Sequence, residues 1–124
     1  MRCRTVWEPC GQQCCTDVVA ALGGQGEYPT PAAMAASAVA SCMLSMIAYT
    51  GAAKGFATEG ISIESGYETN DKGAITALTF DITVPVDAEP AARRMMQGAV
   101  SHCPVGAIIA PEVVKKINWN WREP

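Results

Sequence analysis

Two cysteines lie in apolar, helix-forming stretches of the chain, and their side chains could carry out redox chemistry. Cys42 belongs to residues 40–44 and Cys103 to residues 101–105, and 61 positions separate the two. Cysteine packs as a small hydrophobe, but its thiolate can be oxidised to a sulfenic acid that a second thiol converts into a disulfide. We therefore predict an attacking thiol and a resolving thiol. The alternative is a pair of core cysteines that never meet.

Neither cysteine has an activating group beside it in the sequence. A thiol becomes a good nucleophile only where a cation or a hydrogen-bond donor stabilises its thiolate. His102, the one histidine, is an immediate helix neighbour of Cys103 and should point away from it, which disfavours a Cys–His hydrolase pair. A partner subunit could supply a cation for Cys42, and the candidates within the chain are Arg2, Arg4, Lys54, Arg93 and Arg94.

The remaining four cysteines, Cys3, Cys10, Cys14 and Cys15, crowd the first 15 residues. Secreted disulfide scaffolds spread their cysteines along the chain, so this clustering favours a reducing cytoplasm. The spacing Cys10-X3-Cys14-Cys15 superficially resembles metal ligands, but no second pair completes a set of four. We expect no metal and no cofactor, with a metal- or thiol-responsive role for this segment as a less favoured hypothesis.

Composition limits the class of protein. A chain of 124 residues, 49% apolar and 17% charged, is expected to form one globular domain. A net charge of −3 argues against a nucleic-acid partner. Arg2 and Arg4 are followed by a polar stretch instead of an apolar run, so the start does not resemble a secretory leader.

A long uncharged segment dominates the middle of the chain. Thr30 is the predicted N-cap of a helix over residues 31–49, with Pro31 at its first position and its end near Gly51. Small residues outnumber strongly apolar ones, which argues against a membrane span. A helix that is apolar nearly all round is expected to be buried, and a homodimer would bury it most easily.

After Gly55 the hydrophobic period changes to that of strands. We predict a hairpin from a strand at residues 61–66, a turn at residues 70–73 and a strand at residues 75–84. A helix over residues 88–101, a short helical turn at residues 105–110 and a last strand over residues 113–121 follow. A short strand at residues 4–7 and a helical turn at residues 17–22 are the expectations for the start. This order predicts an α+β fold, with a buried central helix packed against an antiparallel sheet.

Two segments resemble one known family. Residues 31–42 are similar to the helix with the first cysteine of the OsmC/organic hydroperoxide resistance family, and residues 99–105 resemble its second-cysteine motif. The resemblance implies an intertwined homodimer that reduces organic or hydrogen peroxide. It also implies that Cys42 is the peroxidatic cysteine, that Cys103 is the resolving one, and that a small thiol or lipoyl-type molecule is the reductant. Met34, Met43, Met46 and Ile47 would form an apolar wall for an alkyl peroxide.

The sequence departs from the family pattern near its start. Family peroxidases have a glutamate just after the proline that opens the first helix, where it holds an arginine against the thiolate; this chain has Ala32 there, with Glu27 nearby. We interpret residues 1–124 as one OsmC-like domain, with residues 1–27 as an abbreviated N-terminal region and residues 28–124 as the recognisable core. The alternative to a peroxidase is a non-catalytic protein of this fold that binds a small hydrophobic ligand in the dimer crevice.

Overall fold

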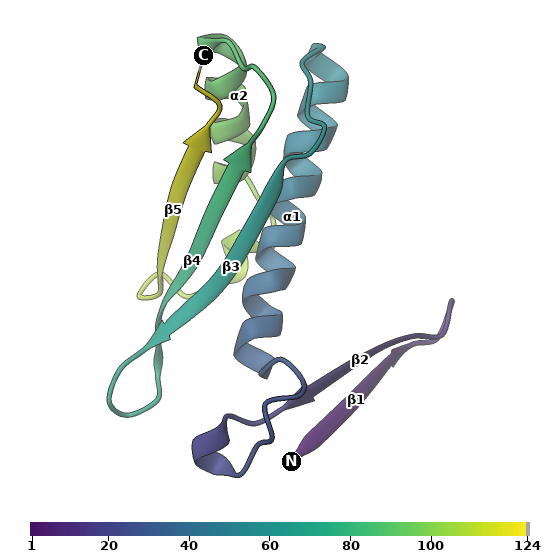
Figure 1. Cartoon of the computed structure of the whole chain (residues 1–124), viewed down its shortest axis with the longest axis vertical. Helices are drawn as coiled ribbons and strands as arrows, with labels where there is room; N and C mark the ends of the chain where they lie inside the picture. Colours follow the sequence, from purple (N-terminus) through teal and green to yellow (C-terminus); the bar gives the residue numbers. More distant parts are fainter. Residues whose placement is uncertain (124) are drawn as a thin grey trace. The chain divides into compact units, whose positions relative to one another are not determined.

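The computed structural model of the chain describes residues 1–123 and divides into two compact units, residues 1–35 and the residues from 36 onward. The elements follow one another as β1 (Arg2–Trp7), β2 (Gln12–Asp17), a 3-10 turn (Ala20–Leu22), α1 (Pro31–Lys54), β3 (Ser62–Thr69), β4 (Ile75–Val84), α2 (Pro90–Ser101), a second 3-10 turn (Gly106–Ile108) and β5 (Val114–Trp121) (Figure 1). The predicted α+β class is confirmed.

The first unit is built on an antiparallel hairpin of β1 and β2. Its turn closes when the backbone N–H of Gly11 donates to the Trp7 carbonyl at 2.7 Å, and Gly11 has a φ of +73°, which favours glycine. The buried carboxylate of Asp17 accepts hydrogen bonds from the N–H groups of Val18 (2.9 Å) and Gln25 (3.0 Å). The predicted strand at residues 4–7 is part of β1, but β2 was not predicted.

Helix α1 begins as predicted and ends later than predicted. The Ala33 N–H donates to Thr30 Oγ1 at 3.1 Å, which confirms Thr30 as the N-cap. The expected end near Gly51 was wrong, because Gly51 is a buried helical residue and the helix runs to Lys54. It ends where Gly55 adopts a φ of +81° and the N–H groups of Gly55 and Phe56 both donate to the Gly51 carbonyl.

The second unit contains a three-stranded sheet in the order β3–β4–β5 (Figure 1). The predicted hairpin is confirmed: β3 and β4 are antiparallel, and Asn70 Oδ1 accepts hydrogen bonds from two backbone N–H groups in the turn. The antiparallel expectation fails for β5, which lies parallel to β4 because α2 carries the chain back to the same end of the sheet. Residues of α1, α2 and the inner face of the sheet form one apolar core, with Val39, Met43, Ile47, Phe80, Ile82 and Met96 almost fully buried.

One side of α1 is exposed in the single chain. Tyr49 is 73% exposed, and the other exposed residues on the helix include Ala38, Ser41, Ser45, Ala48 and Ala52. By length and composition α1 could cross a membrane, and it is the one helix among residues 1–123 that could. The core helix of a soluble protein passes the same test, so this is weak evidence for a membrane span.

Candidate active site

Cys103 lies where α2 ends and the chain turns toward the second 3-10 turn. Its side chain is 4% exposed and belongs to the apolar core. The thiol donates to the Val39 carbonyl of α1 at a sulfur–oxygen distance of 3.8 Å. The Cys103 sulfur also accepts a hydrogen bond from the Gly106 N–H at 3.3 Å. Pro104 ends the helical run at this point, and the backbone turn it produces places the Gly106 amide over the sulfur.

Cys42 is in the middle of α1, one helical turn after Val39, and its side chain is half-buried against the same core. The structure brings the two predicted cysteines together, because the thiols of Cys42 and Cys103 are neighbours that interact directly. Their 61-residue separation in sequence is closed by the packing of the α2 end on α1. This arrangement favours the predicted pair over the alternative of two core cysteines that never meet.

The surroundings of Cys103 favour its protonated form. Burial raises the pKa of the Cys103 thiol above its ordinary value of 9.0, and a hydrogen bond with the Cys42 thiol raises it further. The N–H of Gly106 acts in the opposite direction, because a donor stabilises the thiolate. Cys103 thus retains its proton in the dry interior, and Cys42 is the more exposed residue of the two.

Three of the five predicted cations lie on the same unit as Cys42, and their described contacts are with other groups. Lys54 is twelve residues beyond Cys42 on the same helix, about 18 Å along the axis. Arg93 donates from Nε to the Ala88 carbonyl, and its guanidinium lies 4.9 Å from the centre of the Trp121 ring. Arg94 is exposed on α2.

The other two predicted cations belong to the N-terminal unit. Arg2 pairs with Glu27 at 2.6 Å, is 3.7 Å from the Asp17 carboxylate, and stacks its guanidinium on Tyr28. Arg4 is directly opposite Cys15 in the β1–β2 register. Glu27 therefore does hold an arginine, although it precedes α1.

Lys115 is a cation near the site that sequence reasoning missed. Its Nζ donates to the Gly106 carbonyl at 3.0 Å, so the backbone of one residue contacts both this lysine and Cys103. The register pairs Lys115 with Leu78, on the same face of the sheet as Ile117, Trp119 and Trp121. A signal was present in the sequence: Lys115 continues the two-residue period of those three apolar residues, and it is the one charged member of that row.

The six cysteines are free thiols in the structure. Cys3, Cys10 and Cys14 are exposed, and Cys15 is half-buried. Within residues 1–123, no three His, Cys, Asp or Glu side chains are grouped closely enough to hold a metal ion.

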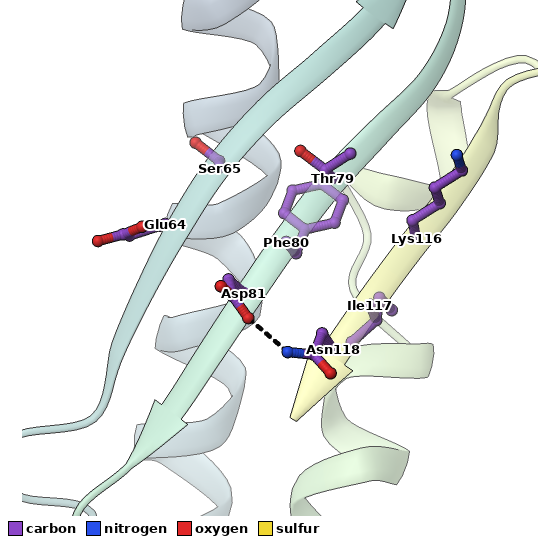
Figure 2. Close-up of a pocket in the computed structure, with 8 residues that line it drawn as sticks. All are labelled: Glu64, Ser65, Thr79, Phe80, Asp81, Lys116, Ile117 and Asn118. Carbon is purple, nitrogen blue, oxygen red and sulfur yellow. Dashed lines mark hydrogen bonds between the residues drawn. The ribbon is translucent and has the colours of Figure 1, made fainter. Parts of the chain in front are cut away.

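A shallow hollow on the sheet has a different chemistry from the thiol pair. Figure 2 shows polar side chains of three strands around it, including Glu64 on β3, Asp81 on β4 and Asn118 on β5. Glu64 is directly opposite Asp81, which suggests a carboxylate dyad. However, hydrogen bonds from Asn118 (2.7 Å) and Asn120 (3.0 Å) lower the pKa of Asp81, so it does not hold the proton that a general acid would need.

A family model for OsmC-like proteins matches residues 24–118. The chain belongs to the OsmC-like family. The predicted family resemblance is thereby confirmed, and it covers both cysteine segments. No curated protein matches the chain.

Solved structures agree with this fold at low sequence identity. A candidate osmotic stress induced and detoxification response protein from Psychrobacter arcticus 273-4 matches with a TM-score of 0.89 and 21% identity, over 96% of this chain and 88% of that one. An organic hydroperoxide resistance protein OsmC from Legionella pneumophila matches with a TM-score of 0.68 and 19% identity, over 97% of this chain and 95% of that one. An organic hydroperoxide resistance protein from Elizabethkingia anophelis matches with a TM-score of 0.72 and 14% identity, over 98% of this chain and 94% of that one. At these identities the likeness shows the fold alone.

Proposed function

We propose that this OsmC-like protein is a thiol-dependent peroxidase in which Cys42 attacks the peroxide and Cys103 resolves the product. The observation that carries the proposal is the direct neighbourhood of a half-buried thiol and a fully buried one in the same core. This placement assigns a different role to each thiol. The more exposed thiol reacts with the peroxide, and the buried thiol reacts with the sulfenic acid that results.

The proposed chemistry proceeds in three balanced steps. The Cys42 thiolate attacks one oxygen of the peroxide ROOH, the O–O bond breaks, and ROH leaves after taking a proton; Cys42 becomes a sulfenic acid. The Cys103 sulfur then attacks the Cys42 sulfur, the S–O bond breaks, and the hydroxide leaves as water with the Cys103 proton. Two equivalents of a small thiol, or one lipoyl-type dithiol, reduce the disulfide and are themselves oxidised to a disulfide.

Proximity also protects the attacking residue. A sulfenic acid that waits for a partner can be oxidised further to an irreversible sulfinic acid. Because Cys103 and Cys42 are neighbours in the same core, a small movement of either side chain would suffice for condensation. The raised pKa of Cys103 means that its proton is still available to leave with the departing hydroxide.

Arg2 is the candidate for the arginine that the family resemblance implies. It is held by Glu27, as the resemblance requires of a glutamate, although Ala32 occupies the usual glutamate position.

A homodimer is the proposed functional unit. Its support is the exposed side of α1, where an aromatic ring and several small residues face outward from a helix without a charged residue before Lys54. Burying that side against a second copy would remove apolar surface from water. A cytoplasmic location is likewise proposed, on the basis of six free thiols.

The predicted apolar wall for an alkyl peroxide needs correction. Met43 and Ile47 are 1% and 0% exposed in the core, so they cannot face a substrate. A different set of residues lines the hollow beside α1, which has a volume of about 260 Å³. The lining residues are Ser37, Ala40, Ser41, Leu44, Ile63 and Ser65. This hollow has both polar and apolar lining residues, and it is where we would look for the alternative function, the binding of a small hydrophobic ligand.

Peptide mapping tests the proposed function. The reduced protein is treated with one equivalent of tert-butyl hydroperoxide, its remaining thiols are blocked, and the digest is analysed by mass spectrometry without reductant. We expect one peptide pair linked through Cys42 and Cys103, and no such pair in Cys42→Ser. A linked pair among Cys3, Cys10, Cys14 and Cys15 with Cys42 and Cys103 still reduced would refute the proposal and direct the search to a ligand.

A further inference from the structure

Gly106 connects a lysine with the buried cysteine. Its N–H donates to the Cys103 sulfur at 3.3 Å, and its carbonyl accepts from Lys115 Nζ at 3.0 Å. A Cβ added at Gly106 would lie 3.4 Å from Lys115 Nζ and 3.7 Å from Cys103 Sγ. The ammonium nitrogen and the sulfur therefore lie within about 7 Å of one another, on the side of Gly106 where a side chain is absent.

Other charged groups do not compete at this position. The helix that carries Cys42 and Val39 has no charged residue before Lys54. On β4, the inward residues Leu78, Phe80 and Ile82 are apolar, and on β5 the inward residues beyond Lys115 are apolar too. His102 points its Nδ1 at the Gly98 carbonyl and is exposed. On β3, Tyr67 is directly opposite Leu78 and packs against the same core. Among these described residues, Cys42 interacts with Cys103 and Lys115 bonds to Gly106 beside it.

We propose that Lys115 is a positioning residue for Cys103: its ammonium group holds the Gly106 carbonyl, and with it the backbone of Gly106, so that the Gly106 N–H and the nearby positive charge stabilise the Cys103 thiolate. The Gly106 N–H and the Gly106 carbonyl belong to adjacent peptide units that share the Gly106 Cα, so a bond at the carbonyl restrains the orientation of the N–H. The nearby ammonium group also adds a positive charge, and a positive charge favours a thiolate. Lys115 itself does not need to touch the sulfur.

The step that uses this arrangement is the reduction of the disulfide, and that part of the inference rests on the proposed function. An external thiolate reaches the half-buried Cys42 sulfur and not the buried Cys103 sulfur. A new S–S bond then forms at Cys42, the Cys42–Cys103 bond breaks, and Cys103 takes the electron pair as a thiolate. Disulfide exchange is faster when the leaving thiolate is more stable, so Lys115 is expected to accelerate regeneration and not peroxide attack.

Ionisation of Cys103 is the direct test. In a Cys42→Ser background, the cysteine ¹³Cβ signals are followed by NMR across the alkaline range, with Cys103→Ser used to assign the signal. We expect Lys115→Met to raise the titration midpoint of Cys103, so that the thiolate fraction at a fixed lower pH falls about two- to five-fold. Lys115→Arg should restore most of the loss because it keeps the charge. Lys116→Met is the matched control, since the neighbouring Lys116 bonds to Glu68 instead.

A second arm uses the oxidised protein with Cys42 intact. Reduction by excess dithiothreitol should be at least about twofold slower in Lys115→Met than in Lys116→Met, since the leaving thiolate is less stable. Equal midpoints and equal reduction rates in these two variants would overturn the inference. A shifted midpoint with no peroxide-driven disulfide would refute the proposed function alone, and a disulfide with unshifted midpoints would refute the Lys115 inference alone.

Discussion

The Cys103 thiol donates a hydrogen bond to the Val39 carbonyl at 3.8 Å, which ties the end of α2 to the middle of α1. Val39 is one turn before Cys42 on the same face of the helix, so this contact sets the distance between the two thiols. The packing of two helix segments, and not a loop, thereby holds the proposed reaction partners in place. Several consequences can be measured.

Alkaline pH should destabilise the reduced protein through Cys103. Its pKa is raised in the folded state, so its contribution to stability is fully present below the ordinary value of 9.0 and is lost as pH rises through the folded value. Urea unfolding in the presence of reductant should show a free energy of unfolding that falls above pH 9. The fall should be shallower in Cys103→Ala; parallel curves for the two proteins would contradict the buried, protonated thiol.

Gly51 should not tolerate a side chain. A Cβ there would lie 2.5 Å from Thr58 Cγ2 and 3.0 Å from the Phe56 carbonyl oxygen, so the chain that follows α1 would have to move. We expect Gly51→Ala to lower the free energy of unfolding by about 1–3 kcal/mol in urea titrations, despite the better helix propensity of alanine.

Gly98 provides the control for that substitution. It is also a helical glycine, but a Cβ there meets nothing within 4 Å. Gly98→Ala should therefore stabilise the protein by about 0.5–1 kcal/mol. If both alanine variants moved stability in the same direction, the packing of residues 56–58 on Gly51 would be disproved.

The N-terminal hairpin should open in acid. A hydrogen bond from the Gln25 N–H is the largest of the effects that lower the pKa of Asp17, so the carboxylate contributes stability above its ordinary value of 3.8 and loses it as pH falls through the folded value. At pH 6, Asp17→Asn should accelerate hydrogen exchange at Val18 and Gln25. The exposed Asp71→Asn is the control, and unchanged exchange in Asp17→Asn would count against this role.

The Arg2–Glu27 ion pair should matter for catalysis if it takes the family role. Arg2→Met is then expected to slow peroxide consumption about tenfold or more, since a thiolate without its cation is less available. Glu27→Gln should have a smaller effect in the same direction. Arg94→Met, which removes an exposed arginine from α2, is the control. Equal peroxide rates in all these proteins would exclude Arg2 as the activating residue.

Local chemistry explains which parts of the fold the sequence could predict. Thr30 and Pro31 at the start of α1, and the Asn70–Gly73 turn between β3 and β4, depend on bonds within a few residues, and both were predicted correctly. The end of α1 was not, because Gly51 lies inside the helix and is packed closely against residues 56–58, which follow it in the chain. Strand β2 was missed because Gln12–Asp17 is polar and lacks an apolar alternation.

Some residues of the candidate site could be predicted from the sequence, and others could not. Cys42 and Cys103 could be predicted from residue type and from the resemblance of their segments to family motifs. Lys115 could not be linked to Cys103 from the sequence, because the link depends on the parallel register of β5 against β4 and on the turn at Gly106. Such a contact joins elements that only the tertiary fold brings together.

The central claim, that Cys42 attacks and Cys103 resolves, is tested most directly by single-turnover thiol loss. Reduced wild type, Cys42→Ser and Cys103→Ser are mixed with tert-butyl hydroperoxide or hydrogen peroxide, and free thiols are counted over time. We expect rapid loss of two thiols in wild type, rapid loss without the Cys42–Cys103 disulfide in Cys103→Ser, and no rapid loss in Cys42→Ser. Loss in wild type no faster than that of a free thiol in solution, or rapid loss that survives in Cys42→Ser, would contradict this claim.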